Sequence, residues 1–230
     1  MTFAIILAGG KGVRLGASVP KQFIVVEGKP ILVHTLEKFQ THPLIDAIAV
    51  VCIQGWEDVV REYAVRFSIT KLSQVVTGGE TALESIRRGI NSLDCKEDDI
   101  VVIHDSVRPL VDEDIISNVI RDTAIYGGAI SSVPLSEHVF TPGEEPGMYS
   151  YIPKEHAWRA VSPHAYTYRK IISAFKKAEE TGIGMNSAFI GTMMVDLGEK
   201  VVLSKGSERN IKITDPNDLA FFNLNLHQCP

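Results

Sequence analysis

The segment 7–16 carries the strongest chemical signal in the chain. It runs LAGGKGVRLG directly after a short apolar run, and a proline and Lys21 follow closely. Small residues at this point let backbone N–H groups approach a chain of phosphates closely. Arg14 and Lys21 add positive charge where a triphosphate would lie. The pattern therefore predicts a loop that binds the phosphates of a nucleotide.

Three nucleotide-binding loops could account for this segment. A dinucleotide fingerprint needs Gly-x-Gly-x-x-Gly, and Leu15 stands at its third glycine when Gly10 and Gly12 occupy the first two. A P-loop needs Gly-Lys-Ser/Thr, whereas Gly12 follows Lys11 here. A nucleotidyltransferase loop needs glycines, then an arginine, and then a lysine after a proline. The segment matches this third pattern.

A second candidate site, with the sequence HDSVRP, follows the apolar run 100–103. A carboxylate such as Asp105 at the end of a strand can hold Mg²⁺ through its oxygens. Arg108 can bind a phosphate as a two-pronged fork, although an ordinary surface pair of Asp105 with Arg108 is the alternative. His104 is more typical of a packed or hydrogen-bonded histidine than of a ligand.

Two weaker motifs could complete a nucleotide site. Gly79 permits a close approach, and Ser85, one helical turn into the next element, could hydrogen-bond a base or a ribose. A loop that leads into an ordinary helix is the alternative. Lys212 lies between apolar neighbours in a strand-like run, 210–214, which favours a side chain directed into a cleft. A surface lysine that buries only its stem is the alternative there.

These motifs need a scaffold that brings the ends of strands together. Continuous apolar runs are typical of strands covered on both faces, and they occur at 4–7, 47–52 and 100–103. Amphipathic helical patterns alternate with them, at 59–67, 82–93 and 115–120. This order predicts an α/β fold with a doubly wound, mostly parallel sheet. In such sheets ligands bind outside the carboxyl ends of the strands.

The second half of the chain is less regular. The stretch 136–154 contains two proline–glycine pairs and few periodic apolar residues, which favours an excursion such as a hairpin arm. We assign the arm to about 136–158 of a single domain, 1–230. A helix is expected at 168–178, a strand at 201–203, and a last helix after Asp215, with Asp215 as its N-cap and Pro216 in its first turn.

Composition excludes several classes of function. The chain has 230 residues, and 23 basic against 28 acidic side chains give a net charge of −5, which argues against nucleic-acid binding driven by bulk charge. Its three cysteines show no zinc-type spacing, and no stretch approaches the ~20 apolar residues of a membrane span. We therefore expect a cytoplasmic protein that binds neither nucleic acid nor membrane.

In this order and spacing, the motifs resemble those of the cytidylyltransferases of the methylerythritol-phosphate and ribitol-phosphate group. The resemblance spans about 3–222 and is densest over 5–39. It implies a Rossmann-like α/β domain whose arm exchanges between the subunits of a homodimer. It also implies transfer of CMP from CTP to a polyol phosphate, with release of pyrophosphate and with Mg²⁺ as the cofactor.

The resemblance also implies roles for individual residues. Those at the CTP would be Leu7, Ala8, Gly9, Gly10, Lys11, Gly12, Gly79, Ser85, Asp105 and Ser106. The catalytic cations would be Arg14, Lys21 and Lys212. The acceptor would contact Asp105, Arg108, Lys154 and Ser162, and Asp105 would also bind the metal. An in-line displacement of this kind needs no protein nucleophile, because positioning and charge stabilisation suffice.

The departures from the family pattern lie in the acceptor half. Glu137-His138 replaces Asp-Thr, Ser162-Pro163-His164 replaces Thr-Pro-Gln, and Ala188-Phe189 stands near a Thr-Asp or similar acidic turn. An arm arginine appears here as Lys154, which keeps the charge but not the fork. We therefore expect CTP activation with ribitol 5-phosphate as the favoured acceptor. Methylerythritol 4-phosphate, another polyol or sugar phosphate, or a nucleotide-binding protein without turnover are the alternatives.

Overall fold

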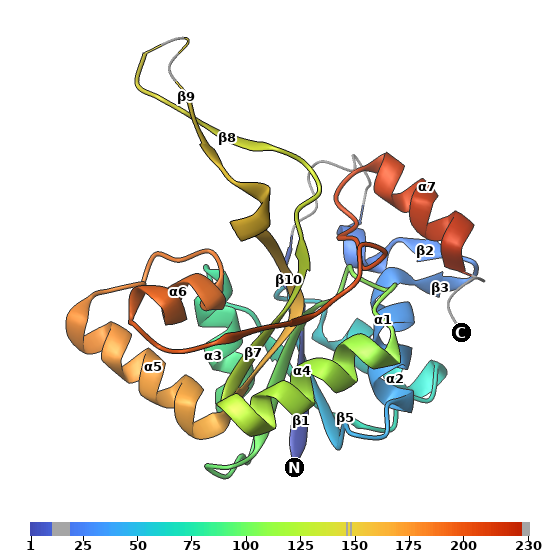
Figure 1. Ribbon diagram of the computed structural model, residues 1–230. Coiled ribbons are helices and arrows are strands. Elements are labelled where there is room, and N and C mark those ends of the chain that lie inside the picture. Colours follow the sequence, from blue (N-terminus) through green and yellow to red (C-terminus); the bar gives the residue numbers. More distant parts are fainter. Residues whose placement is uncertain (11–18, 146, 148, 227–230) are drawn as a thin grey trace.

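A computed structural model describes residues 1–10, 19–145, 147 and 149–226 (Figure 1). A seven-stranded sheet has the order β11-β7-β10-β6-β1-β4-β5. Its strands are β1 (Thr2–Ala8), β4 (Ala47–Cys52), β5 (Leu72–Thr77), β6 (Ile100–Asp105), β7 (Gly128–Pro134), β10 (Trp158–Thr167) and β11 (Val202–Lys205). Within this sheet only β10 runs against its neighbours, β6 and β7. The expected mostly parallel sheet is therefore confirmed.

Helices cover both faces of the sheet, as a doubly wound fold requires (Figure 1). One face packs against α1 (Ile31–Thr41), α2 (Glu57–Arg66) and α4 (Glu113–Tyr126). The other packs against α3 (Ala82–Asn91), α5 (Tyr168–Thr181) and α6 (Ile190–Asp196). Alternate residues of β1 point to opposite faces, so Ile6 joins the first core and Ile5 the second. This double burial explains the continuous apolar run at the start of the chain.

The helix α7 (Pro216–Asn225) packs over a small hairpin, β2 (Val25–Val26) and β3 (Lys29–Pro30). The predicted N-cap is confirmed, because the Asp215 carboxylate accepts hydrogen bonds from the backbone of Asn217 and Asp218. Pro216 occupies the first turn, as expected. The buried side chains of Phe222 in α7 and Ile213 just before it close a third apolar cluster.

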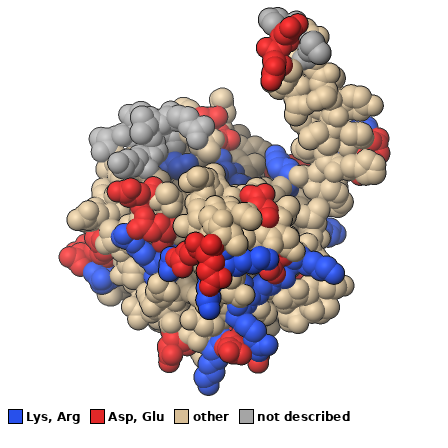
Figure 2. Space-filling model, turned by 90° about the vertical axis from the view of Figure 1, so that its left-hand side faces the viewer, with Lys and Arg blue, Asp and Glu red and all other residues tan. Residues whose placement is uncertain are grey.

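The stretch assigned to the arm forms a two-stranded hairpin, β8 (Val139–Pro142) and β9 (Tyr149–Ile152), followed by a short 3-10 helix, η3 (Lys154–His156). The hairpin projects away from the body of the molecule (Figure 1). Figure 2 shows it as a mostly uncharged stalk with acidic side chains toward its tip. Its exposed aromatic side chains include Phe140, Tyr149 and Tyr151.

One expectation about secondary structure is wrong. The run 210–214 is not a strand but an irregular segment between β11 and α7. The Ile213 N–H donates to the carbonyl oxygen of Val107, and the Ile213 side chain packs in the cluster beneath α7. The apolar residues of this run are therefore explained by side-chain packing and not by pairing in a sheet. The elements without a counterpart among the expected ones include β5, β7, β10 and α6. Within the described part of the chain, every helix is too short or too polar to cross a membrane.

Candidate active site

A cavity of about 540 Å³ opens at the carboxyl ends of β1 and β6 and at the start of α3. The strand order switches at β1, which lies between β4 and β6, so the cavity occupies the crevice where doubly wound sheets bind ligands. The structure brings most of the predicted residues to it: Leu7, Gly9, Gly10, Lys21, Gly79, Ser85, Asp105, Ser106 and Lys212 all line the cavity.

The other predicted residues have different places. Arg14, Lys11 and Gly12 lie outside the described residues. Ala8 is buried at the end of β1, where its carbonyl oxygen accepts a hydrogen bond from the Gln22 side chain at 2.6 Å. Lys154 is exposed in η3 at the base of the arm. Arg108 and Ser162 lie beside the cavity and support Asp105, as described below.

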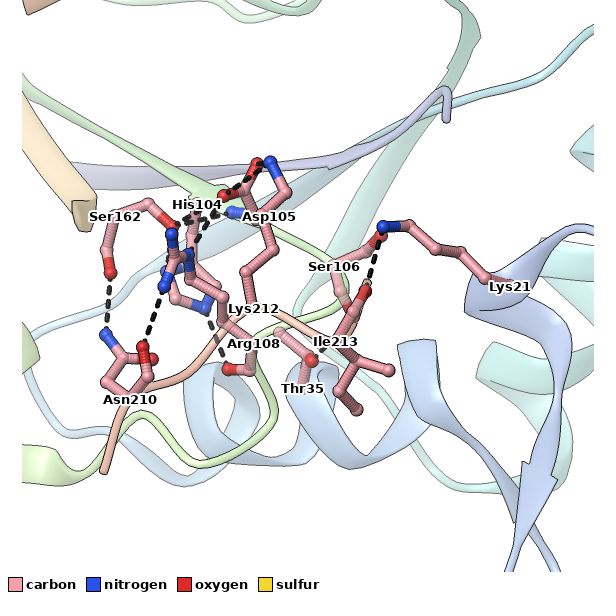
Figure 3. A network of polar contacts seen from close by, with 10 residues as sticks. All are labelled: Lys21, Thr35, His104, Asp105, Ser106, Arg108, Ser162, Asn210, Lys212 and Ile213. Atoms are coloured by element: carbon pink, nitrogen blue, oxygen red, sulfur yellow. Dashed lines mark hydrogen bonds and ion pairs between the residues drawn. The ribbon is translucent and has the colours of Figure 1, made fainter. Parts of the chain in front are cut away.

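Lys21 begins the short 3-10 helix η2 (Lys21–Phe23), directly after a proline. Its Nζ atom donates to the carbonyl oxygen of Ile213 at 2.8 Å (Figure 3). Two neighbouring contacts fix this turn: the Gln22 bond to β1, and stacking of the Phe23 ring on Trp56 with 4.0 Å between ring centroids. The amine is therefore held at the cavity by a rigid backbone, which suits a cation that must meet a phosphate.

The turn between β5 and α3 forms the opposite wall. The Ser85 hydroxyl oxygen accepts from the Gly79 N–H at 3.0 Å, so the two predicted residues are in direct contact. Thr81 caps α3 by accepting from the Glu84 N–H at 3.1 Å. The first turn of α3 thus faces the cavity, and its backbone N–H groups favour a bound anion or a polar ligand.

Asp105 lies at the junction between β6 and the cavity. Its carboxylate pairs with Lys212 Nζ at 3.2 Å and with Arg108 Nε at 3.0 Å (Figure 3). Burial alone would raise the pKa of Asp105, but the positive charges of Lys212 and Arg108 outweigh it and hold the pKa well below its usual range. The carboxylate is therefore anionic at neutral pH. Lys212 points into the cleft, as its apolar neighbours indicated.

A series of hydrogen bonds joins Arg108, His104 and Ser162 to the backbone of Asp105. His104 Nε2 faces the carbonyl oxygen of Arg108 at 3.1 Å, and a carbonyl can only accept, so Nε2 carries the proton. Nδ1 is then an acceptor, and the Ser162 hydroxyl lies 3.2 Å from it and 3.4 Å from the Asp105 carboxylate. The same hydroxyl oxygen accepts from the Asp105 N–H at 3.1 Å. Burial lowers the pKa of His104 to about 4, which keeps the ring neutral. The expectation of a hydrogen-bonded histidine is confirmed.

These hydrogen bonds limit how two of the residues predicted to bind the acceptor, Arg108 and Ser162, can contact it. The Ser162 hydroxyl has two acceptors within reach, His104 Nδ1 at 3.2 Å and the Asp105 carboxylate at 3.4 Å. A substrate that accepted its proton would have to replace them. Arg108 donates from Nε to Asp105 and from Nη1 to the carbonyl oxygen of Asn210 at 2.7 Å. A fork on a phosphate through Nε would require the bond to Asp105 to break, whereas a fork through Nη1 and Nη2 would not. Binding of the acceptor by Arg108 and Ser162 stays a prediction.

Several residues at the site had no predicted role. Gln22, Thr81 and Thr214 line the cavity, and Asn210 anchors the segment that carries Lys212. Thr81 could have been found, because a threonine three residues before a glutamate at a helix start is the sequence pattern of a cap. Gln22 and Asn210 act through bonds to distant main-chain atoms, which leave no local pattern.

Carboxylates are sparse at this site. Within the described ranges, no group of three or more His, Cys, Asp or Glu side chains gathers that could hold a metal ion. A cation bound here would therefore take most of its ligands from a substrate. Mg²⁺ is commonly bound in this way, by one or two carboxylates together with phosphate oxygens and water. Asp105 is suited to be the protein ligand because its carboxylate is anionic and faces the cavity.

Comparison with known proteins identifies the family of this chain. Residues 2–228 match the family model described as IspD, 2-C-methyl-D-erythritol 4-phosphate cytidylyltransferase. A ribitol-5-phosphate cytidylyltransferase from Lacticaseibacillus paracasei is 44% identical over 99% of both chains. A 2-C-methyl-D-erythritol 4-phosphate cytidylyltransferase from Clostridium acetobutylicum is 36% identical over 95% of this chain and 94% of its own length.

Among solved structures, the 4-diphosphocytidyl-2C-methyl-D-erythritol synthase from Anaerococcus prevotii superposes with a TM-score of 0.83 over 99% of this chain and 98% of its own. Its identity to this chain is 22%, so this likeness supports the fold. The family match covers nearly the whole sequence, and two relatives exceed one third identity over nearly their whole length. This chain therefore belongs to the IspD family of cytidylyltransferases.

Proposed function

We propose that this protein transfers CMP from CTP to ribitol 5-phosphate and releases pyrophosphate. The observation that carries the proposal is the cavity in which Lys21, Lys212 and the first turn of α3 meet around Asp105. Two cations and a helix N-terminus at one strand edge suit a nucleoside triphosphate. The acceptor is inferred from the ribitol-5-phosphate cytidylyltransferase that is 44% identical over 99% of both chains.

The reaction is an in-line displacement at phosphorus. A phosphate oxygen of the acceptor forms a bond to the α-phosphorus of CTP, the bond from that phosphorus to the bridging oxygen of the β-phosphate breaks, and pyrophosphate leaves with the bonding electrons. Lys21 and Lys212 stabilise the negative charge that accumulates on the α-phosphate oxygens. Asp105 holds Lys212 at the cavity by their ion pair. Catalysis then consists of positioning and charge stabilisation by this chain's own residues.

We propose Mg²⁺ as the cofactor, with Asp105 as its protein ligand. The ion would neutralise part of the triphosphate charge when bound. Lys212 and Arg108 keep Asp105 ionised, which is the state that a hard cation requires. Removal of divalent ions with EDTA should abolish turnover, and added Mg²⁺ should restore it. Full turnover in EDTA would contradict the metal assignment.

The test of the function is release of pyrophosphate with CTP, Mg²⁺ and a panel of three acceptors: ribitol 5-phosphate, methylerythritol 4-phosphate and glycerol 3-phosphate. We expect turnover with ribitol 5-phosphate. Turnover with methylerythritol 4-phosphate alone would overturn the acceptor and favour the activity named in the family description. Binding of CTP without turnover on any of the three would contradict cytidylyl transfer to this group of acceptors.

We also propose that the arm pairs two copies of this chain. Phe140, Tyr149 and Tyr151 are each more than 60% exposed on the hairpin, and Trp158 at its base is 47% exposed. A row of exposed aromatic side chains on a projecting hairpin is costly for a monomer and typical of an interface. Sedimentation at micromolar concentration should give a dimer. Replacing Tyr149 and Tyr151 by serine should give a monomer, and an unchanged dimer would contradict the role of the arm.

The cytoplasmic location is likewise a proposal. Both cysteines in the described residues, Cys52 and Cys95, are free thiols. Burial raises the pKa of each thiol to about 11, so both stay protonated and unreactive at neutral pH. Thiols of this kind suit a reducing compartment. Fractionation of cells that express the protein, with a cytoplasmic and a surface marker, tests the location.

A further inference from the structure

The segment that carries Lys212 has no regular secondary structure of its own. Residues 206–214 connect β11 to α7 without entering a strand or a helix. We call residues 210–214 the strap. No ladder of hydrogen bonds fixes the path of the strap, so individual contacts must place the Lys212 amine (Figure 3).

Asn210 anchors the first end of the strap. Its side chain is 2% exposed, and Nδ2 donates to the carbonyl oxygen of Ser162 at 2.7 Å. A carbonyl oxygen can only accept, so the amide nitrogen must face it. The main-chain oxygen of Asn210 in turn accepts from Arg108 Nη1 at 2.7 Å. Both the side chain and the backbone of this residue are therefore tied to the body of the protein.

Ile213 anchors the other end. Its N–H donates to the carbonyl oxygen of Val107 at 2.9 Å, and its own carbonyl oxygen accepts from Lys21 Nζ at 2.8 Å. Its side chain is fully buried. Lys212 lies between the two anchors, 43% exposed, with Nζ 3.2 Å from the Asp105 carboxylate. Fixing both ends of the strap thus fixes the point from which the flexible lysine stem reaches into the cavity.

Ser162 forms hydrogen bonds with both segments that carry this ion pair, at Asp105 and at the strap. Its hydroxyl oxygen accepts from the Asp105 N–H, and its carbonyl oxygen accepts from the Asn210 side chain. We propose that Asn210 is a positioning residue, whose bond to Ser162 sets the Lys212 amine against Asp105 and the reacting phosphates. The catalytic part of this proposal rests on the proposed cytidylyl transfer, whereas the placement of Lys212 does not.

The chemistry of Asn210 supports a role beyond packing. Its Oδ1 atom is buried with no hydrogen-bond partner within the described part of the chain. A buried polar atom without a partner destabilises a fold, and an apolar residue at such a position would avoid this. The single bond from Nδ2 is therefore the contact that an asparagine contributes here, and it joins the strap to Ser162.

The first test is a double-mutant cycle on turnover. N210A should lower kcat by about 10- to 100-fold, because a small displacement of a catalytic group is costly. In a K212A background the same substitution should lower kcat by less than about twofold, because it acts through the missing amine. N118A is the matched control: Asn118 also donates from its side chain to a main-chain oxygen, that of Lys205, and should leave kcat unchanged. Equal losses from N210A in both backgrounds, or no loss, would contradict the proposal.

The second test needs no turnover. Wild type, N118A, N210A and N210S are treated with acetic anhydride without substrates, and mass spectrometry gives the labelling rate of Lys212 relative to the exposed Lys154. Loss of the Asp105 pairing should raise this ratio several-fold in both Asn210 variants and not in N118A. An unchanged ratio overturns the proposal even if no acceptor supports turnover. Unfolding of both Asn210 variants would also contradict the proposal. Asn210 is proposed to position the strap, and its loss should leave the sheet folded.

Discussion

In the described residues, the half of the molecule that would bind the nucleotide pairs its buried polar side chains, whereas the half that would bind the acceptor leaves several without a hydrogen-bond partner. The nucleotide half consists of β1, β4, β5 and β6 with helices α1 to α3. The acceptor half consists of residues 128–214, which include β7, the arm, β10, α5, α6, β11 and the segment 206–214. Five buried side-chain atoms in the described residues have no hydrogen-bond partner, and all lie in the acceptor half: Ser131 Oγ, His164 Nδ1, Tyr166 OH, Ser204 Oγ and Asn210 Oδ1.

The connections of the two halves explain this difference. In the nucleotide half, β5 leads directly into a turn and a helix whose N–H groups pair with nearby side chains, those of Thr81 and Ser85. In the acceptor half, an antiparallel strand, a long excursion and an irregular segment meet, and their polar groups must find partners far along the chain. The described part of the nucleotide half therefore pairs its buried polar side chains, and the acceptor half can change with less disturbance to the fold. The departures from the family pattern lie in that second half.

The largest expected effect comes from replacing one lysine in each half, Lys21 and Lys154, and comparing turnover with the KM for the acceptor. K21A should lower turnover by about 10²–10³-fold, because it removes a fixed donor to the charge that develops at the α-phosphate. K154A should act mainly on KM for the acceptor, by about tenfold or less, because an exposed point charge contributes little. Steady-state kinetics with CTP and ribitol 5-phosphate varied in turn, on variants with unchanged circular dichroism, check both values. Turnover of K21A near that of wild type would contradict its catalytic role.

A second comparison uses the buried histidine of the acceptor half. Burial lowers the pKa of His164 to about 3. The negative charge of Asp105 raises this pKa, but His104 and Arg108 lower it further. The unfolded value is about 6.5, so the unfolded chain gains a proton as the pH falls below 6.5 while the folded chain does not. Stability is then lost from pH 6.5 downward, until the pH reaches about 3. At pH 5 this one residue should account for a loss of about 2 kcal/mol.

Urea unfolding of wild type and H164Q at pH 7.5 and pH 5 measures this loss. The decrease in the free energy of unfolding between the two pH values should be smaller in H164Q by about 2 kcal/mol. His104, whose pKa is also lowered by burial, contributes the same kind of loss in both proteins and does not affect the difference. H138Q removes an exposed histidine of the arm and serves as the control. An equal pH dependence in wild type and H164Q would show that the side chain is protonated or solvated in the fold.

Features set by local sequence could be predicted, whereas contacts between residues far apart in the sequence could not. The strand at 47–52 has the predicted bounds, and the motifs after β1 and β6 converge because the carboxyl ends of parallel strands meet at one edge. The Asn210–Ser162 bond joins residues 48 positions apart and involves a main-chain oxygen, so no spacing in the sequence announces it. Two departures from the family pattern, His164 and Phe189, turn out to pack edge to face, with 4.9 Å between ring centroids. Local patterns revealed the residues but not this contact.

The smallest expected effect tests the contrast with one buried hydroxyl from each half. Thr35 in α1 is fully buried and donates to the carbonyl oxygen of Ser106 at 2.8 Å, next to Asp105. Ser204 in β11 is 1% exposed, and its hydroxyl oxygen has no partner in the described residues. T35V keeps the shape of the side chain but leaves the Ser106 carbonyl oxygen without this donor, so it should cost about 1–2 kcal/mol. S204A removes an unpartnered hydroxyl and should change stability by less than about 0.5 kcal/mol, or raise it.

Urea unfolding of both variants at pH 7.5 gives the two values. The difference between the two values is the test, because both residues are almost fully buried and only the Thr35 hydroxyl has a hydrogen-bond partner among the described residues. T35V should also raise the concentration of CTP needed for half-maximal turnover, since Ser106 lines the cavity, whereas S204A should not. Equal costs for the two substitutions would mean that the Ser204 hydroxyl is paired in the folded protein. The contrast between the two halves would then fail at this position, and tolerance of unpartnered groups would no longer explain the altered acceptor residues.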